Sequence, residues 1–176
     1  WIRGDNLELM PVAEAKYATG DKAYLVGTGF LISLMKEHGG LHVLVNNAGI
    51  AILKRTEDLT LADWNRQIAT NLTSVFIGSK FAMEQMKTNG GGSIINMSSV
   101  NAHLALDAQV VYTTSKGGVQ QLTRVQAVAL APYNIKVNAM APGPIETDLM
   151  RRVGSDKQLM DTILSRTPQG RVGTTR

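Results

Sequence analysis

Short apolar runs rich in β-branched residues alternate along this chain with longer stretches in which apolar positions recur at helical spacing. The runs are bounded by glycine, proline or other turn-forming residues, which is typical of buried strands, and they are Leu41–Asn46, Ser93–Ser98 and Ile135–Met140. The longer stretches predict helices at Asp21–Glu37, from Thr60 to about Thr70, from Leu72 to about Lys87 and over Gln109–Ala131. Thr60 and Asp63 have the spacing of a capping box, which indicates where the second helix begins.

This alternation predicts both the fold class and the place of a site. Helices of this length between strands indicate βαβ crossovers, and therefore an α/β fold with a doubly wound, Rossmann-like parallel sheet covered on both faces. In such sheets, ligands bind outside the carboxyl ends of the strands. Those ends are unusually polar or rich in glycine and proline here, at Asn46–Gly49, Ser98–Asn101 and Ala141–Pro144. We therefore expect one cleft where these three segments meet.

Composition and charge narrow the classes of function. The 176 residues are enough for one domain, and the absence of cysteine excludes disulfides, thiolate zinc sites and thiol catalysis; we expect no metal site. No apolar run approaches the roughly 18 residues of a membrane span, so no membrane partner is expected, and a domain that needs no disulfide suits the cytoplasm. The net charge of +4 arises within residues 151–176, which contain no aromatic residue. Because nucleic-acid-binding surfaces spread basic groups over a face and interleave aromatics, we expect no nucleic-acid partner.

The candidate chemistry begins with Tyr112 and Lys116, which lie four residues apart on one face of a predicted helix. An ammonium group lowers the pKa of a nearby phenol from about 10, so the pair could exchange a proton with an alcohol or carbonyl; a surface pair is the alternative. Ser99 leaves a strand 13 residues earlier and could hold the same substrate oxygen, with Ser98 as the alternative because only one hydroxyl can face the cleft. Asn71 lies between two predicted helices, where a buried amide usually has a fixed partner.

Five segments, in this order and at these separations, resemble the short-chain dehydrogenase/reductase family in its common form. They are Val43–Gly49, Asn71-Leu72, Ile94–Ser99, Tyr112-x-x-x-Lys116 and Val137–Gly143. The resemblance covers roughly residues 20–172. It implies hydride transfer between NAD or NADP and an alcohol or carbonyl substrate, in which the cofactor supplies the electrons and the protein supplies position and proton transfer.

The resemblance also implies a role for individual residues. Tyr112 is expected to be the general acid or base, Lys116 to lower its pKa and bind the nicotinamide ribose, and Ser99 to orient the substrate oxygen. Asn71 is expected to hold a water molecule that links Lys116 to solvent. The remaining cofactor-binding residues implied by the resemblance are Asn46, Asn47, Ala48, Gly49, Pro142, Gly143, Ile145 and Thr147.

The substrate wall is expected to mix polar and apolar side chains. Its candidates are Asn101, His103, Leu104, Leu106, Gln109 and Met150, with a solvated loop position equally open for His103. Such a wall is compatible with a sugar, a hydroxy acid, a ketoacyl thioester or a small ketone. Residues Pro144–Leu164 are expected to form a mobile lid, with a permanently packed helix pair as the alternative.

Several parts of the family pattern have no counterpart here. The glycine-rich loop and first βαβ unit that the family places ahead of these motifs are missing, and Val26–Gly29 is interpreted as the interior of a helix. The position that separates NAD from NADP is missing too. We therefore expect residues 1–176 to be one partial domain, incomplete at both ends, of a longer protein that forms a homo-oligomer, either a dimer or a tetramer. The rival hypothesis is a family member that has lost its cofactor and acts as a regulatory or interaction module.

Overall fold

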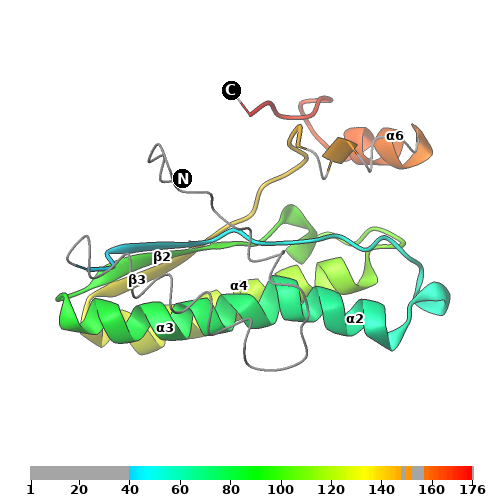
Figure 1. Ribbon diagram of the computed structural model, residues 1–176. Helices are drawn as coiled ribbons and strands as arrows, with labels where there is room; N and C mark the ends of the chain where they lie inside the picture. The colour runs from blue at the N-terminus through cyan, green and yellow to red at the C-terminus, as the bar shows by residue number, and fades with distance from the viewer. Residues whose placement is uncertain (1–39, 148–149, 152–156, 176) are drawn as a thin grey trace, which may run out of the picture.

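A computed structural model describes residues 40–147, 150–151 and 157–175. Three parallel strands form its sheet in the order β1-β2-β3, and they are β1 (Val43–Asn46), β2 (Gly92–Met97) and β3 (Ile135–Met140) (Figure 1). The register places Asn46 beside Asn96 and Met97 beside Met140, so the three carboxyl ends reach the same edge. The parallel α/β sheet predicted from the sequence is confirmed, with β1 starting two residues later than expected and β2 shifted by one.

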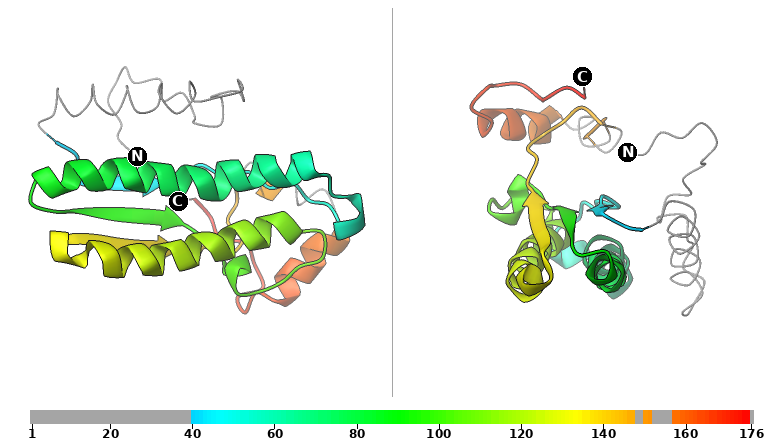
Figure 2. Two further views of the ribbon diagram at one scale, coloured as in Figure 1. Left: turned by 90° about the horizontal axis from the view of Figure 1, so that it is seen from below. Right: turned by 90° about the vertical axis from the view of Figure 1, so that its left-hand side faces the viewer.

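Two long helices of the described part lie against one face of this sheet. They are α3 (Ser74–Thr88), which follows α2 (Leu61–Ile68), and α4 (Val110–Leu130), and Figure 2 shows α3 and α4 side by side beneath the strands. The apolar core lies between these helices and the sheet, and it is formed by Ala82, Met86, Ile94, Leu130, Ile135 and Val137. On the opposite face, Val43 and Val45 are exposed. The described residues therefore cover one face of the sheet, whereas the sequence predicted helices on both.

The two helices expected around Asn71 are joined without a break, which corrects the prediction. The capping box forms as expected: the Asp63 backbone N–H donates to Thr60 Oγ1 at 3.1 Å, and the Asp63 carboxylate accepts from the Thr60 N–H. After α2, residues Ala69–Thr73 continue as a π-helical turn, η3, directly into α3. A π-turn accommodates one additional residue while the backbone stays hydrogen-bonded. Asn71 is therefore fully buried inside a helix rather than in a gap between two.

The chain beyond α4 reaches the site in two steps. A short 3₁₀ turn, η5 (Ala131–Tyr133), and Asn134 in the left-handed region (φ 56°) lead into β3, close to the helix end predicted near Pro132. After β3 the backbone extends away from the sheet toward α6 (Lys157–Ser165), which stands beyond the strand ends in Figure 1. Ile145 bridges to Gly173, and the Glu146 N–H donates to the Gly173 carbonyl at 2.8 Å, which ties this extension to the segment after α6.

Two short 3₁₀ turns complete the described elements, and some predictions fall outside them. The turns are η2 (Thr56–Asp58) and η4 (Val100–Ala102). The expected helix at Asp21–Glu37, with Val26–Gly29 inside it, lies outside the described residues, as does part of the expected lid. No helix in the described ranges is long and apolar enough to cross a membrane.

Candidate active site

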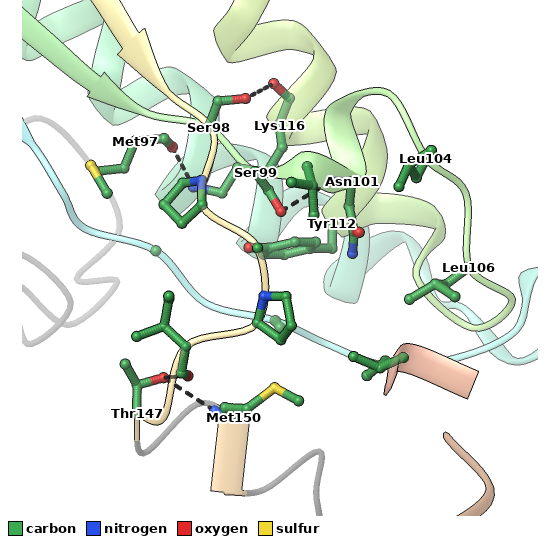
Figure 3. A pocket seen from close by; sticks show the side chains of 18 of the residues that line it. Met97, Ser98, Ser99, Asn101, Leu104, Leu106, Tyr112, Lys116, Thr147 and Met150 are labelled. Carbon is green, nitrogen blue, oxygen red and sulfur yellow. Dashed lines mark hydrogen bonds between the residues drawn. The ribbon is translucent and has the colours of Figure 1, made fainter. Parts of the chain in front are cut away.

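A pocket of about 410 Å³ opens at the carboxyl ends of the strands, bounded on its far side by the extension after β3 and the end of α6. Tyr112 and Lys116 reach it from the first turns of α4, and Ser99 reaches it from the end of β2 (Figure 3). The i, i+4 spacing on α4 puts both side chains on the helix face toward the strand ends. The structure thus brings together the three residues that the sequence singled out for proton transfer.

The two neighbouring serines after β2 make different contacts. Ser98 Oγ is buried and donates to the Lys116 carbonyl oxygen at 3.0 Å, so it ties β2 to α4. Ser99 Oγ accepts the Asn101 backbone N–H at 3.1 Å and makes a side-chain hydrogen bond with Tyr112. Ser99 is therefore the serine whose hydroxyl lies beside the phenol, as the 13-residue spacing favours.

Lys116 is a nearly buried cation, only 5 % exposed. Its Nζ donates to the Met97 carbonyl oxygen at 2.6 Å, at the end of β2. Burial lowers the pKa of Lys116 from 10.5 to about 8, because the ammonium form loses hydration that one carbonyl does not replace. The side chain therefore holds a proton and unused donor capacity at the base of the pocket.

Tyr112 corrects one expectation. Burial raises the pKa of the Tyr112 phenol above 10.0, and the hydrogen bond with Ser99 opposes this shift. The sequence predicted the reverse, a lowering by Lys116. The reason for the difference is burial, which is the largest cause of the shift; Lys116 Nζ lies 5.8 Å from the centre of the Tyr112 ring and donates to Met97. A phenol with a raised pKa is protonated at neutral pH, which is the state that a general acid requires.

The side chain of Asn71 holds the loop that follows β1 by hydrogen bonds. Its Oδ1 accepts the Ile50 N–H at 2.8 Å, and its Nδ2 donates to the Ile50 carbonyl at 2.9 Å and to Ser115 Oγ at 3.0 Å. Gln67, one turn earlier, accepts the Ile52 N–H at 2.9 Å. Both amide protons of Asn71 are thus used within the protein, and the water-holding role expected of this residue stays a prediction.

The loop after β1 divides between structural and pocket-lining residues. Asn46 Nδ2 donates to Asn96 Oδ1 at 2.8 Å and to Ser79 Oγ at 3.1 Å, so Asn46 ties β1 to β2 and α3. Asn47 and Gly49 line the pocket, whereas Asn46 and Ala48 are not among its lining residues. A Cβ on Gly49 would lie 3.6 Å from both Asn71 Oδ1 and Lys116 Nζ, so this backbone passes close over the lysine.

The segment after β3 supplies the opposite wall. Pro142, Gly143, Ile145 and Thr147 all line the pocket, as expected for the cofactor side. No atom lies within 4 Å of the position that a Cβ on Gly143 would occupy, so the backbone there faces open space. Thr147 Oγ1 accepts the Met150 N–H at 3.3 Å, which holds the start of the next turn (Figure 3).

The expected substrate wall is only partly realised. Asn101, Leu104, Leu106 and Met150 line the pocket. Gln109 is buried behind Asn101, which donates to its Oε1, and His103 is exposed with its ring beside the Gln120 amide. The structure does not bring His103 to the pocket, because the turn η4 directs it toward α4 and solvent.

Sequence reasoning missed five lining residues, which are Ala51, Met97, Val100, Arg166 and Thr167, whereas Pro144 and Ile163 lie within the segment expected to form the lid. The first three lie beside motif residues and could have been found from them. Arg166 and Thr167 follow from the position of α6, which no motif indicates. Among the described residues, no group of three or more histidine, aspartate or glutamate side chains could hold a metal ion.

Comparisons with known proteins agree with this geometry. Residues 29–176 match a family model described as enoyl-(acyl carrier protein) reductase. A cyclopentanol dehydrogenase of a Comamonas species is 36% identical over 144 residues, which is 82% of this chain and 58% of that protein. A 3-alpha-(or 20-beta)-hydroxysteroid dehydrogenase of Mycobacterium tuberculosis is 42% identical over 128 residues, 73% of this chain and 48% of that protein.

Solved structures give the same result. A gluconate 5-dehydrogenase from Burkholderia cenocepacia, in complex with NADP and tartrate, superposes with a TM-score of 0.81 at 32% identity, covering 93% of this chain and 61% of that one. A 7 alpha-hydroxysteroid dehydrogenase, complexed with NADH and 7-oxo glycochenodeoxycholic acid, gives 0.77 at 32% identity over 84% and 57%. The chain spans about half to three fifths of the length of these relatives. A family model that matches most of the chain, and relatives this similar in sequence and fold, show that the chain belongs to the short-chain dehydrogenase/reductase family.

Proposed function

We propose that this chain carries the catalytic machinery of an oxidoreductase that interconverts a secondary alcohol and a carbonyl with NAD or NADP. The observation that carries the proposal is the convergence of Ser99, Tyr112 and Lys116 on one pocket at the strand ends. Relatives named for cyclopentanol and for 3-alpha- or 20-beta-hydroxysteroids support this reaction class, because each of these compounds is a secondary alcohol.

The residues around the pocket fit a nicotinamide cofactor. Lys116 Nζ is buried with one proton directed at Met97, which leaves donors for a ligand hydroxyl such as those of a ribose. Asn47, Gly49 and Gly143 offer backbone to a flat ligand, and no atom blocks the approach at Gly143. When bound, the nicotinamide supplies or accepts the hydride.

The chain's own residues then position the substrate and move its proton. In carbonyl reduction, the Tyr112 hydroxyl donates its proton to the substrate oxygen, and Ser99 Oγ donates a hydrogen bond to the same oxygen. Burial raises the pKa of Tyr112 above 10.0, so the phenol is protonated at neutral pH when the substrate arrives, and the hydrogen bond with Ser99 favours the phenolate once the proton has left. In alcohol oxidation, the same groups act in reverse, with the phenolate as general base.

Tyr112→Phe in the full-length enzyme tests this assignment, because it removes the proton donor and keeps the ring. Turnover should fall by roughly 10²–10⁴, while affinity for the nicotinamide cofactor changes little. Tyr133→Phe is the matched control, since Tyr133 is an exposed tyrosine in η5, before the start of β3, whereas the pocket lies at the carboxyl ends of the strands and Tyr133 does not line it. Retention of more than about a tenth of the wild-type turnover by Tyr112→Phe would contradict the role of Tyr112.

We further propose that the full-length protein is cytoplasmic and that it forms a homo-oligomer. Phe76 on α3 and Val125 and Val128 on α4 are exposed, with Val128 at 79%, and large apolar side chains on neighbouring helices favour a protein contact. A second copy of the chain is the proposed partner for these two helices. Sedimentation of the full-length protein, before and after Val128→Lys, tests it: dissociation on substitution supports the contact, and an unchanged oligomer contradicts it.

A further inference from the structure

We infer that Arg166 recognises a carboxylate on the substrate, so that the preferred substrates are hydroxy acids or oxo acids. This inference rests on the proposed oxidoreductase function and adds the class of substrate. Arg166 comes directly after α6 and lines the same pocket as Tyr112 and Ser99. It belongs to neither the proton-transfer group nor the segments that fit the cofactor.

The guanidinium of Arg166 is held in a defined place. Its Nη1 donates to the Ala105 carbonyl oxygen at 2.9 Å, across 61 positions of sequence. Ala105 lies between Leu104 and Leu106, and both of these leucines line the pocket. The cationic group therefore sits at the leucine wall of the pocket, and one hydrogen bond to Ala105 leaves several of its five N–H donors for a ligand.

The charges around the pocket favour an anion at this position. Among the described lining residues, the charged side chains are Lys116 and Arg166, and none is acidic. The nearest carboxylate in the chain segment beside Ala105 is Asp107, which pairs with Arg55 at 3.1 Å. Lys116 is directed at Met97 and the cofactor side. Arg166 is thus the cation that the described lining residues provide for a substrate group.

The chemistry favours a carboxylate over a phosphate monoester. A guanidinium presents two parallel N–H donors that match the two oxygens of a planar carboxylate. One arginine balances the single negative charge of that group, whereas a phosphate monoester carries nearly two charges at neutral pH. The leucines that flank Ala105 suit a short carbon chain between the carboxylate and the reacting carbon.

The test compares matched acidic and neutral substrates in the full-length enzyme with its nicotinamide cofactor. The probes are short-chain oxo acids and their primary amides, which have nearly the same size and shape but replace the charged carboxylate with a neutral group that has one acceptor oxygen and an NH2 donor. Arg166→Gln should lower kcat/KM for the acids by about tenfold or more, mainly through KM, and change it little for the amides. Arg166→Lys should restore part of the loss because it keeps the charge. Lys157→Gln, which removes an exposed charge from the start of the same helix, is the matched control.

Each result bears on the inference in one direction. The inference is supported if Arg166→Gln lowers kcat/KM for the acids alone and if added salt lowers the wild-type kcat/KM for the acids. An equal loss on acids and amides would make Arg166 a support for the Ala105 loop and would overturn it, as would no loss at all. If the wild type has the same kcat/KM for amides and neutral ketones as for acids, the proposed function stands and this inference fails. If it turns over none of them with either cofactor, the proposed function itself fails.

Discussion

Lys116 is expected to destabilise the folded protein at neutral pH, and its replacement by methionine should therefore raise stability. Methionine fills a similar volume without a charge. The pKa of Lys116 falls from 10.5 to about 8 on folding, and a difference of about 2.5 in pKa corresponds to about 3 kcal/mol. Loss of the hydrogen bond to the Met97 carbonyl costs about 1 kcal/mol, which leaves a net gain of about 2 kcal/mol for Lys116→Met at pH 7.

The sign of the pH dependence follows from the same pKa values. Between about pH 8 and 10.5, the folded protein binds fewer protons at Lys116 than the unfolded chain does. Stability therefore rises with pH across this window, as the cost of the buried charge disappears. Lys116→Met has no such charge, so the stability gap between the variant and the wild type should narrow as the pH approaches 10.

Urea unfolding followed by circular dichroism, at pH 7 and at pH 10, measures this gap. Lys80→Met is the control, because Lys80 is an exposed lysine on α3, and it should change stability by no more than about 0.5 kcal/mol. A Lys116→Met variant that is less stable than the wild type at pH 7 would refute the reasoning. So would a gap that stays constant between the two pH values. Confirmation would mean that the chain keeps a destabilising residue for its chemistry.

Two further substitutions, with Gly117→Ala as a control, test how β1 and the loop after it are held. Asn71→Ala removes three hydrogen bonds from a fully buried site and leaves the Ile50 backbone groups unpaired, so the free energy of unfolding should fall by about 2–4 kcal/mol, measured by urea unfolding. Gly78→Ala should cost about 1–3 kcal/mol, because its Cβ would come within 2.7 Å of Asn46 Oδ1. Gly117→Ala on α4, with no atom closer than 3.9 Å, should be neutral or stabilising by about 0.5–1 kcal/mol. A Gly78→Ala variant as stable as Gly117→Ala would contradict the packing argument.

The sequence predicted the strands and their carboxyl ends because short runs of β-branched residues bounded by turn-forming residues leave a strong pattern. It also favoured Ser99 over Ser98 through the 13-residue spacing to Tyr112; both serines line the pocket, and Ser99 is the one beside the phenol. The π-turn was not predictable in this way. A helical repeat with one additional residue has the same composition as two helices around a break, and Asn71 was interpreted as that break.

Burial explains the other differences. The spacing of Tyr112 and Lys116 predicts a nearby charge, but the extent to which the fold removes water from each group depends on residues far away in sequence. The pKa of Tyr112 therefore rises where the sequence predicted a fall. The places of His103 and Arg166 also depend on distant parts of the chain. His103 lies in the loop nearest the motifs, yet it faces solvent, whereas Arg166 follows α6 and lines the pocket.

The π-turn at Ala69–Thr73 means that this helix carries one residue more than a continuous α-helix of the same length would hold. Because the turn absorbs that residue, deleting one residue there would restore α-helical geometry and leave α2 and α3 in nearly the same relative orientation. Only residues of the turn itself would change the side that they face, and Asn71, which holds Ile50, is one of them. A single-codon deletion in this turn should therefore loosen the loop after β1, and with it the pocket wall, while the packing of α2 and α3 is kept.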